Sequence, residues 1–213
     1  VTSSTLSEGS YSLTATATNA ASNTSSASSA LSVTVYADDG DASFSISGIK
    51  EVGETLSISE DSVDPDGTGT LSYSWQTSSD NSSWSVVGTN ATYTVGASEE
   101  GKSIKAVISY QDGQGFDETV TTSAASIPYV DNGQASFSIN GTAAVGNTLS
   151  IKEDSADPDG NGTLSYSWQT SSDNSSWSVV GTNATYTVGA SEEGKSIKAV
   201  ISYQDGQGFD ETV

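Results

Sequence analysis

The sequence predicts an all-β chain of tandem antiparallel β-sandwich repeats. Apolar and polar residues alternate with a period of two along many short segments, as half-buried strands require. A long stretch of the chain occurs twice, and no segment has a convincing helical period. Four Trp, nine Tyr and regularly spaced Val and Ile also distinguish this Ser-, Gly- and Asn-rich chain from a disordered one.

The duplication sets the organisation of the 213 residues. Residues 41–120 align with residues 134–213 at an offset of 93 without a gap; nine of these 80 positions differ, and the last 52 are identical. A unit of this length is close to one immunoglobulin-like sandwich of about 100 residues. We therefore expect tandem immunoglobulin-like antiparallel β-sandwich repeats, with repeat 1 over 37–127 and repeat 2 over 128–213.

Both ends of the chain are expected to belong to longer domains. Residues 1–36 differ from the repeats and predict the last hairpin of a preceding immunoglobulin-like domain, with a strand over 10–18, a turn near 19–23 and a strand to Tyr36. Repeat 2 stops at Val213, partway through its expected last strand. The first four residues have neither the basic nor the apolar region of a signal peptide, so an export signal is expected outside this segment.

Within repeat 1 the alternation predicts strands over 42–47, 55–60, 70–76, 84–87, 91–95, 103–111 and 117–127. In the third of these, Leu71, Tyr73 and Trp75 share one face, and Trp75 is expected in the core. Residues 112–115, Asp-Gly-Gln-Gly, predict the hairpin between the last two strands, because glycine permits a positive φ.

The composition excludes several classes of function. Six Lys and 27 acidic residues give a net charge of −21, which repels nucleic acid and anionic lipid, so we expect neither as a partner. No apolar run approaches the roughly 20 residues of a membrane helix, and no membrane insertion is expected. The absence of Cys and His excludes disulfides, thiol nucleophiles and Cys/His zinc sites. Glu99 and Glu100 are a carboxylate pair, but in a short loop, so we expect no glycosidase and no other enzyme.

Two sets of residues resemble known families. The segments 69–75, 79–84, 100–104 and 110–115 closely resemble immunoglobulin-like repeats of giant bacterial adhesins and RTX-type exoproteins. Residues 8–19 are similar to the end of the biofilm-associated-protein type of immunoglobulin-like domain, although that pattern usually has Asp at Asn19 and Gly at Ser22. Together the resemblances cover nearly the whole chain. They imply a secreted or cell-surface array that is often stiffened by calcium, as in cadherin-like arrays, and they do not identify an adhesive target.

The acidic loops are the candidate sites. In an immunoglobulin-like sandwich the start of the first strand lies at the same end as the loops after the second and sixth strands, so carboxylates of the linker and both loops should gather there. The loop carboxylates of the opposite end should face the next linker. Ca²⁺, which takes about six to eight oxygen ligands, would relieve their repulsion. The candidate ligands are Asp38, Asp39, Asp41, Asp64, Asp66, Asp112, Glu99, Glu100, Asp131, Asp157, Asp159 and Asp205. The alternative is that these loops are ordinary solvated turns.

The sequence therefore predicts a stalk or extender module of a secreted bacterial surface adhesin, stiffened by calcium at the junctions between repeats. Its partners are then Ca²⁺ and the neighbouring repeats of the same chain, and its location is extracellular. The alternative function is a carbohydrate-binding module of a secreted polysaccharide-active protein. In that case Trp84, Tyr93 and Tyr110 would form a sugar-stacking platform, whereas aromatic residues of such sandwiches more often cover the core.

Overall fold

The computed structural model describes residues 5–213, so the first four residues of the expected N-terminal hairpin segment lie outside the description. The chain divides into two compact units, residues 1–128 and 129–213. Within the described residues the only helical elements are two 3₁₀ turns, Ala97–Glu99 and Ala190–Glu192. This confirms the all-β prediction. No helix in that range is long and apolar enough to cross a membrane.

The segment before repeat 1 contains a two-stranded antiparallel sheet. Strand β1 (Gly9–Leu13) pairs with β2 (Leu31–Val35), so β1 is shorter than the expected strand over 10–18. The expected turn is present: Asn19 Oδ1 accepts hydrogen bonds from the backbone N–H groups of Ala21 and Asn23. A two-stranded sheet of this kind is marginal in water, because it buries little apolar surface.

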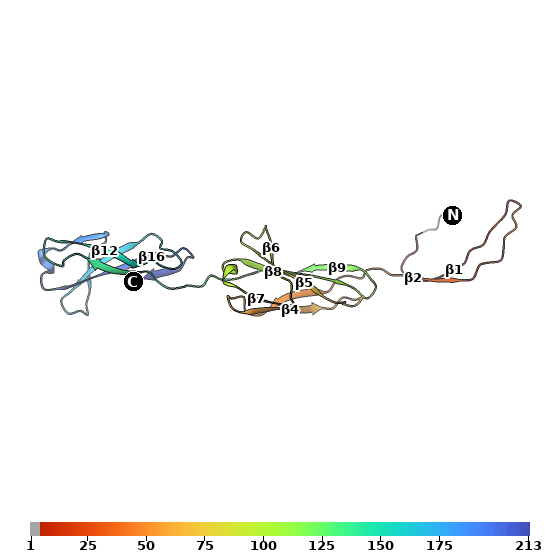
Figure 1. Ribbon diagram of the computed structural model, residues 1–213, viewed down its shortest axis with the longest axis horizontal. Helices are drawn as coiled ribbons and strands as arrows, with labels where there is room; N and C mark the ends of the chain where they lie inside the picture. The colour runs from red at the N-terminus through yellow and green to blue at the C-terminus, as the bar shows by residue number, and fades with distance from the viewer. Residues whose placement is uncertain (1–4) are drawn as a thin grey trace. The chain divides into compact units, whose positions relative to one another are not determined.

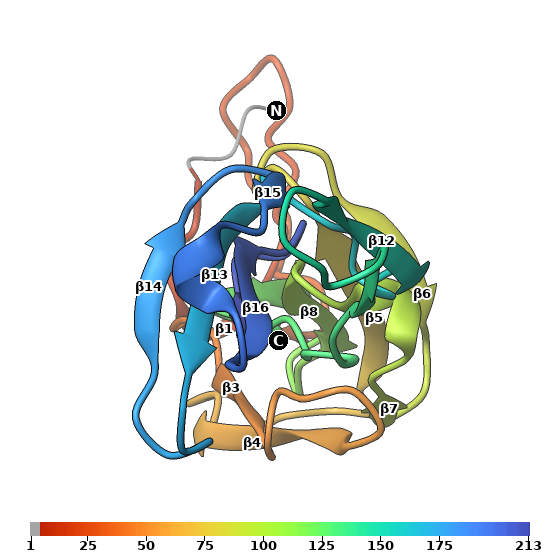
Figure 2. The same ribbon diagram turned by 90° about the vertical axis from the view of Figure 1, so that its left-hand side faces the viewer.

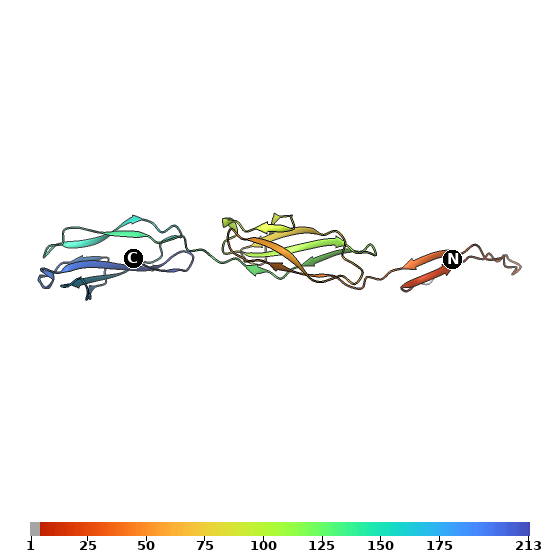
Figure 3. The same cartoon turned by 90° about the horizontal axis from the view of Figure 1, so that it is seen from below.

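Repeat 1 is a sandwich of two antiparallel sheets (Figures 1 and 3). One sheet contains, in spatial order, β3 (Ser43–Ser47), β4 (Thr55–Ser62) and β7 (Thr92–Thr94). The other contains β6 (Ser85–Gly88), β5 (Ser72–Ser78) and β8 (Ser103–Gln111), and β8 also pairs with β9 (Asp117–Thr121) and β10 (Ala125–Ser126). The prediction for β8 is confirmed at both ends.

Repeat 2 repeats this arrangement. Its first sheet contains β11 (Ser136–Asn140), β12 (Thr148–Ser155) and β15 (Thr185–Thr187). Its second contains β14 (Ser178–Gly181), β13 (Ser165–Ser171), β16 (Ser196–Gln204) and β17 (Asp210–Thr212). Figure 2 shows β14, β13 and β16 side by side, as their backbone pairing requires.

A fully buried tryptophan lies at the centre of each sandwich. Trp75 donates its indole N–H to the carbonyl oxygen of Asn90 at 2.9 Å, and Trp168 donates to Asn183 at the same distance. Tyr93 stacks on Trp75 with 5.9 Å between ring centroids. The polar end of a buried indole needs such a partner, which the loop before β7 supplies. Trp75 is therefore a core residue, as predicted.

The expected single strand over 117–127 is wrong, because the structure divides it into β9 and β10. Thr122 lies at the break: its N–H donates to the Ala106 carbonyl, while its side-chain hydroxyl accepts the Ala106 N–H. A side-chain oxygen thus takes the place of a backbone carbonyl, and regular pairing stops. β10 then pairs with the start of β8.

Candidate metal centre

A buried tyrosine ties the first strand of each repeat to the acidic loop after its second strand. The Tyr110 hydroxyl donates to Asp64 Oδ2 at 2.7 Å and accepts the N–H of Ala42 at 2.8 Å. Tyr203 makes the matching bonds in repeat 2, to Asp157 at 2.7 Å and from Ala135 at 2.8 Å. Burial, aided by the nearby carboxylate, raises the pKa of Tyr110 to about 12. The hydroxyl therefore stays protonated and keeps its role as a donor.

The second acidic loop of each repeat folds around one carboxylate oxygen. Asp112 Oδ1 accepts the N–H groups of Gln114, Gly115 and Phe116 at 2.9, 2.5 and 2.7 Å. Asp205 Oδ1 accepts the three equivalent N–H groups at 2.9, 2.6 and 2.8 Å. Each aspartate is thus a turn residue, as the alternative interpretation expects. Only Oδ1 is used for the turn, so Oδ2 remains available for another interaction.

A glycine brings the two acidic loops of repeat 1 together. The N–H of Gly113 donates to the carbonyl oxygens of Asp66 and Gly67, both at 3.2 Å. A Cβ atom at Gly113 would lie 2.5 Å from the Asp66 carbonyl oxygen, so a larger residue would separate the loops. Gly206 lies in the same way against Asp159. Close approach of the loop backbones places their carboxylates beside one another.

Six of the predicted ligands form two clusters. One oxygen from each of Asp64, Asp66 and Asp112 lies within 4.8 Å of the other two, and Asp157, Asp159 and Asp205 form the same group. In the described part of the chain no lysine forms an ion pair with these residues; the ion pair present there joins Lys152 and Asp154. Three carboxylates so close together repel one another unless a cation or protons neutralise them. Carboxylate oxygens are the ligands that Ca²⁺ prefers.

Each linker is hydrogen-bonded to the acidic loop of the repeat that follows it. The N–H of Asp39 donates to Asp66 Oδ2 at 2.9 Å, and the N–H of Asn132 donates to Asp159 Oδ2 at 2.7 Å. Asp38 Oδ1 accepts the N–H of Gly40, whose φ of 112° suits only glycine. Asp131 forms the same turn with Gly133. The side chains of Asp39 and Asp131 therefore belong to the linkers and lie outside the two clusters.

Glu118 is a functional candidate that the sequence interpretation missed. It is buried on β9, and one of its oxygens lies within 4.8 Å of oxygens of Asp38 and Asp41. Hydrogen bonding to Asp41, burial and the charges of Asp38, Asp41 and Asp64 raise the pKa of Glu118 to about 7. The period of two places Glu118 on the same inward face as Val120, and an acid at a core-facing position was the available signal.

Glu99 and Glu100 belong to a separate feature. Glu99 Oε2 accepts the N–H of Gly96 at 2.9 Å and its Oε1 accepts the Ser98 hydroxyl at 2.6 Å, so the carboxylate caps its own 3₁₀ turn. Tyr93 lies next to Glu99: burial and this carboxylate raise the pKa of Tyr93 to about 12. Neither glutamate belongs to a carboxylate group of three in the described residues. Their predicted role at the junction of the repeats stays a prediction.

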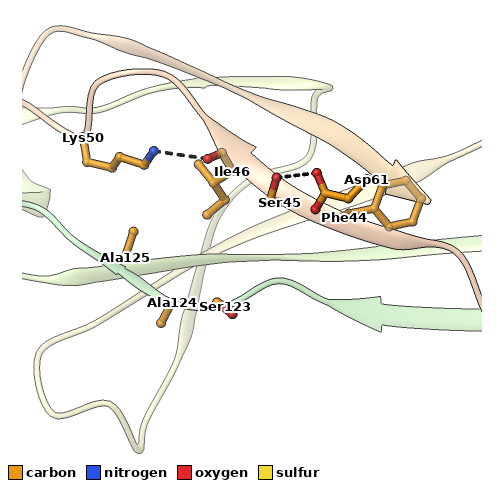
Figure 4. Close-up of a pocket in the computed structure, with 8 residues that line it drawn as sticks. All are labelled: Phe44, Ser45, Ile46, Lys50, Asp61, Ser123, Ala124 and Ala125. Atoms are coloured by element: carbon orange, nitrogen blue, oxygen red, sulfur yellow. Dashed lines mark hydrogen bonds between the residues drawn. The ribbon is translucent and has the colours of Figure 1, made fainter.

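The aromatic residues proposed for sugar stacking do not share an exposed surface. Tyr110 is buried, Tyr93 stacks on Trp75, and Lys105 Nζ lies 4.1 Å from the Trp84 ring centroid. A cavity of about 300 Å³ in repeat 1 lies elsewhere, between β3 and residues 123–125 (Figure 4). Its charged lining residues are bonded to β3: Lys50 Nζ donates to the Ile46 carbonyl, and Asp61 accepts the Ser45 hydroxyl.

Comparison with known proteins identifies no family: no family model and no curated protein matches the chain. One similar solved structure is a "Ca2+-stabilized adhesin" that "helps an Antarctic bacterium reach out and bind ice", with 14% sequence identity and a TM-score of 0.35. The similarity covers 96% of this chain and 55% of that one, so this chain spans about half the length of that protein.

Proposed function

We propose that this chain is an extender module of a secreted bacterial surface adhesin, in which tandem repeats form a stalk and calcium stiffens the linkers. The observation that carries the proposal is the docking of each linker on the repeat that follows it, through Asp66 and Asp159. A docked linker has fewer accessible backbone conformations than a free one. A stalk needs this restriction at every junction, because each free hinge shortens its mean reach.

Calcium is the proposed partner of the acidic ends. The carboxylates form groups of three whose oxygens lie within 4.8 Å of one another, and the whole chain has a net charge of −21. Extracellular calcium modules bind with a Kd of roughly 10⁻⁴–10⁻³ M. At a calcium concentration about tenfold above Kd, linkage supplies about 1.4 kcal/mol per site. That is small against the stability of a domain and sufficient to bias one hinge about tenfold.

The duplication supports a structural role over an enzymatic or carbohydrate-binding one. Two copies that are identical over 52 consecutive positions add length and add no new surface chemistry. A carbohydrate-binding module would be favoured by a row of exposed aromatic rings, and Trp84, Tyr93 and Tyr110 do not form one. The proposed module is therefore not an enzyme, and its adhesive target is bound by another part of the protein.

Small-angle scattering of the full chain tests the proposal. We expect calcium to increase the maximum dimension relative to a chelator-treated sample. The double variant Asp66→Asn with Asp159→Asn should lose this response. The control is Asp80→Asn with Asp173→Asn, which removes the same charge from a turn of each repeat and retains the Oδ1 that caps it. A maximum dimension that is equal with calcium and with chelator would contradict the calcium-stiffened stalk.

A further inference from the structure

Several buried side-chain oxygens that make no hydrogen bond lie close to the acidic loops of the two repeats. Within residues 5–213, the buried side-chain polar atoms that make no hydrogen bond are Asp205 Oδ2, Gln207 Oε1 and Glu211 Oε2 in repeat 2 and Gln114 Oε1 in repeat 1. Every one is an acceptor, and every one lies on the second acidic loop or the strand after it. Native proteins rarely leave buried polar atoms unpaired, and such atoms together often contact a bound ion or water.

Asp205 is the best defined of these residues. Its side chain is only 7% exposed, and its Oδ1 is occupied by three backbone N–H groups. Its Oδ2 is buried without a partner, although the residue belongs to the cluster with Asp157 and Asp159. A buried carboxylate oxygen beside two other carboxylates is disfavoured unless positive charge neutralises it. The three N–H groups around Asp205 all bond Oδ1 and carry no positive charge, so Oδ2 is not neutralised.

Two further oxygens lie beside the same cluster. Gln207 donates its Nε2–H to Asp159 Oδ1 at 2.9 Å, which fixes its amide at the cluster while Oε1 makes no bond. Glu211 is 3% exposed; burial and the charges of Asp131, Asp157 and Asp205 raise its pKa, although a hydrogen bond from Gln134 opposes this shift. Carboxylate and amide oxygens from three separate segments of the chain thus meet at one place. This is a hard-oxygen ligand set with no nitrogen or sulfur ligand.

We propose that repeat 2 binds a calcium-type divalent cation entirely within itself, through Asp157, Asp159, Asp205 Oδ2 and Gln207 Oε1, with Glu211 as a buried neighbouring charge. The equivalent residues in repeat 1, Asp64, Asp66, Asp112 and Gln114, would form a second copy of the site, while Glu118 lies with Asp38 and Asp41. The inference rests on the proposed calcium-dependent function and deepens it, because every ligand comes from one repeat and none from across the junction. A flexible set of protein oxygens suits Ca²⁺, whereas Mg²⁺ requires near-ideal octahedral geometry and retains several waters.

Calorimetric titration of the full chain with CaCl₂ tests the site. The buffer contains about 0.15 M KCl, which screens exposed charges more than about 8 Å apart and so suppresses diffuse binding to the acidic surface. Asp205→Asn should remove one bound ion per chain, Asp112→Asn should remove one, and the double variant should remove both. Asparagine retains the Oδ1 that caps the turn, so the fold should persist. Circular dichroism in chelator checks this.

The matched control is Asp210→Asn, which removes the same charge from an exposed position on β17. It should leave the number of bound ions unchanged. Terbium is a second probe, because Tyr203 bonds to Asp157 and would transfer its excitation energy to an ion held there. Tyrosine-sensitised terbium emission should fall in Asp205→Asn and persist in Asp210→Asn. Unchanged stoichiometry in a folded Asp205→Asn variant, or a wild-type chain that binds no ion, would overturn the site.

The two proposals fail in different ways. If calcium binds with the expected stoichiometry and the scattering dimension does not change, the site within each repeat stands and the stiffened stalk is wrong. If calcium extends the chain while Asp112→Asn and Asp205→Asn bind as many ions as the wild type, the stalk stands and its ligands are others.

Discussion

The two linkers differ in chemistry although they dock in the same way. Linker 1, residues 38–41, is Asp-Asp-Gly-Asp, and linker 2, residues 131–134, is Asp-Asn-Gly-Gln. In linker 2 the amide of Asn132 donates a second hydrogen bond to Asp159, at 3.1 Å, and Gln134 hydrogen-bonds Glu211. In linker 1 the equivalent residues are acids, and a hydrogen bond with Asp41, together with burial and nearby carboxylate charges, raises the pKa of Glu118 to about 7.

Two amides in linker 2, Asn132 and Gln134, supply hydrogen-bond donors at positions where linker 1 has carboxylates. An ionised carboxylate accepts hydrogen bonds and cannot donate them, whereas Asn and Gln do both. Linker 2 is therefore partly neutralised by its own side chains. In linker 1 only protons or a cation can reduce the repulsion between the carboxylates. We therefore expect the stability of repeat 1 to depend more strongly on pH and on calcium than that of repeat 2.

The largest expected effect is a loss of stability when the buried tyrosine of either repeat is replaced. It tests whether the two repeats differ only in their linkers. Tyr110→Phe and Tyr203→Phe each leave a buried carboxylate oxygen and a backbone N–H without a partner, which should lower the free energy of unfolding by about 1–3 kcal/mol. Calorimetric melting in chelator measures the loss. Because the bonds have equal lengths in both repeats, equal losses are expected. Clearly unequal losses would show that the repeats differ beyond their linkers.

An exchange of the linker residues should also exchange the calcium dependence of the melting temperature between the two repeats. Asp39→Asn with Asp41→Gln gives linker 1 the donors of linker 2, and the hydrogen bonds gained should raise the melting temperature in chelator. The same variant should show a smaller rise in melting temperature with calcium. Asn132→Asp with Gln134→Asp should do the reverse in repeat 2. If neither exchange alters the calcium response, the linker side chains are not its cause.

The pH dependence in chelator should distinguish the repeats further. In the folded state the pKa of Glu118 is about 7, above its ordinary value of 4.5, so the folded chain binds the proton more tightly than the unfolded one between these values. Stability should therefore fall as pH rises from about 4.5 to about 7. Glu118→Gln should flatten this part of a melting-temperature profile. Glu211→Gln should have the smaller effect, because Gln134 favours the charged form of Glu211. If the two variants show the same dependence of melting temperature on pH, the proposed difference between the repeats is wrong.

The smallest expected effect comes from a surface ion pair that is present in repeat 2 and has no equivalent in repeat 1. Lys152 replaces Ser59 and pairs with Asp154 at 2.7 Å, with side-chain exposures of 65% and 37%. Exposed pairs contribute little, because water and salt screen them. Lys152→Ser should therefore produce no measurable change in melting temperature at physiological salt. A measurable loss would mean that surface charge, as well as the linkers, separates the two repeats.

The repeat, most of the strands and two of the three acidic clusters could be predicted from the sequence. Alternation of two residues follows from the pleat of a strand, and β8 and the core position of Trp75 follow from it directly. Asp64, Asp66 and Asp112 could be placed together because their loops follow strands that end at the same side of a sandwich. These inferences depend on local periodicity and on topology alone.

The contacts of each carboxylate oxygen could not be predicted from the sequence. The alternation along the chain separates Asp117 from Glu118, but the packing of β9 decided that Asp117 faces solvent and that Glu118 is buried against Asp41. The sequence placed Glu99 among the ligands, and the fold closed its carboxylate onto the turn that contains it. From the sequence, Tyr110 was a candidate for sugar stacking. In the structure its hydroxyl is buried, accepts the N–H of Ala42 and donates to Asp64. Hydrogen-bond partners distant in sequence are fixed by packing, and packing depends on the whole sandwich.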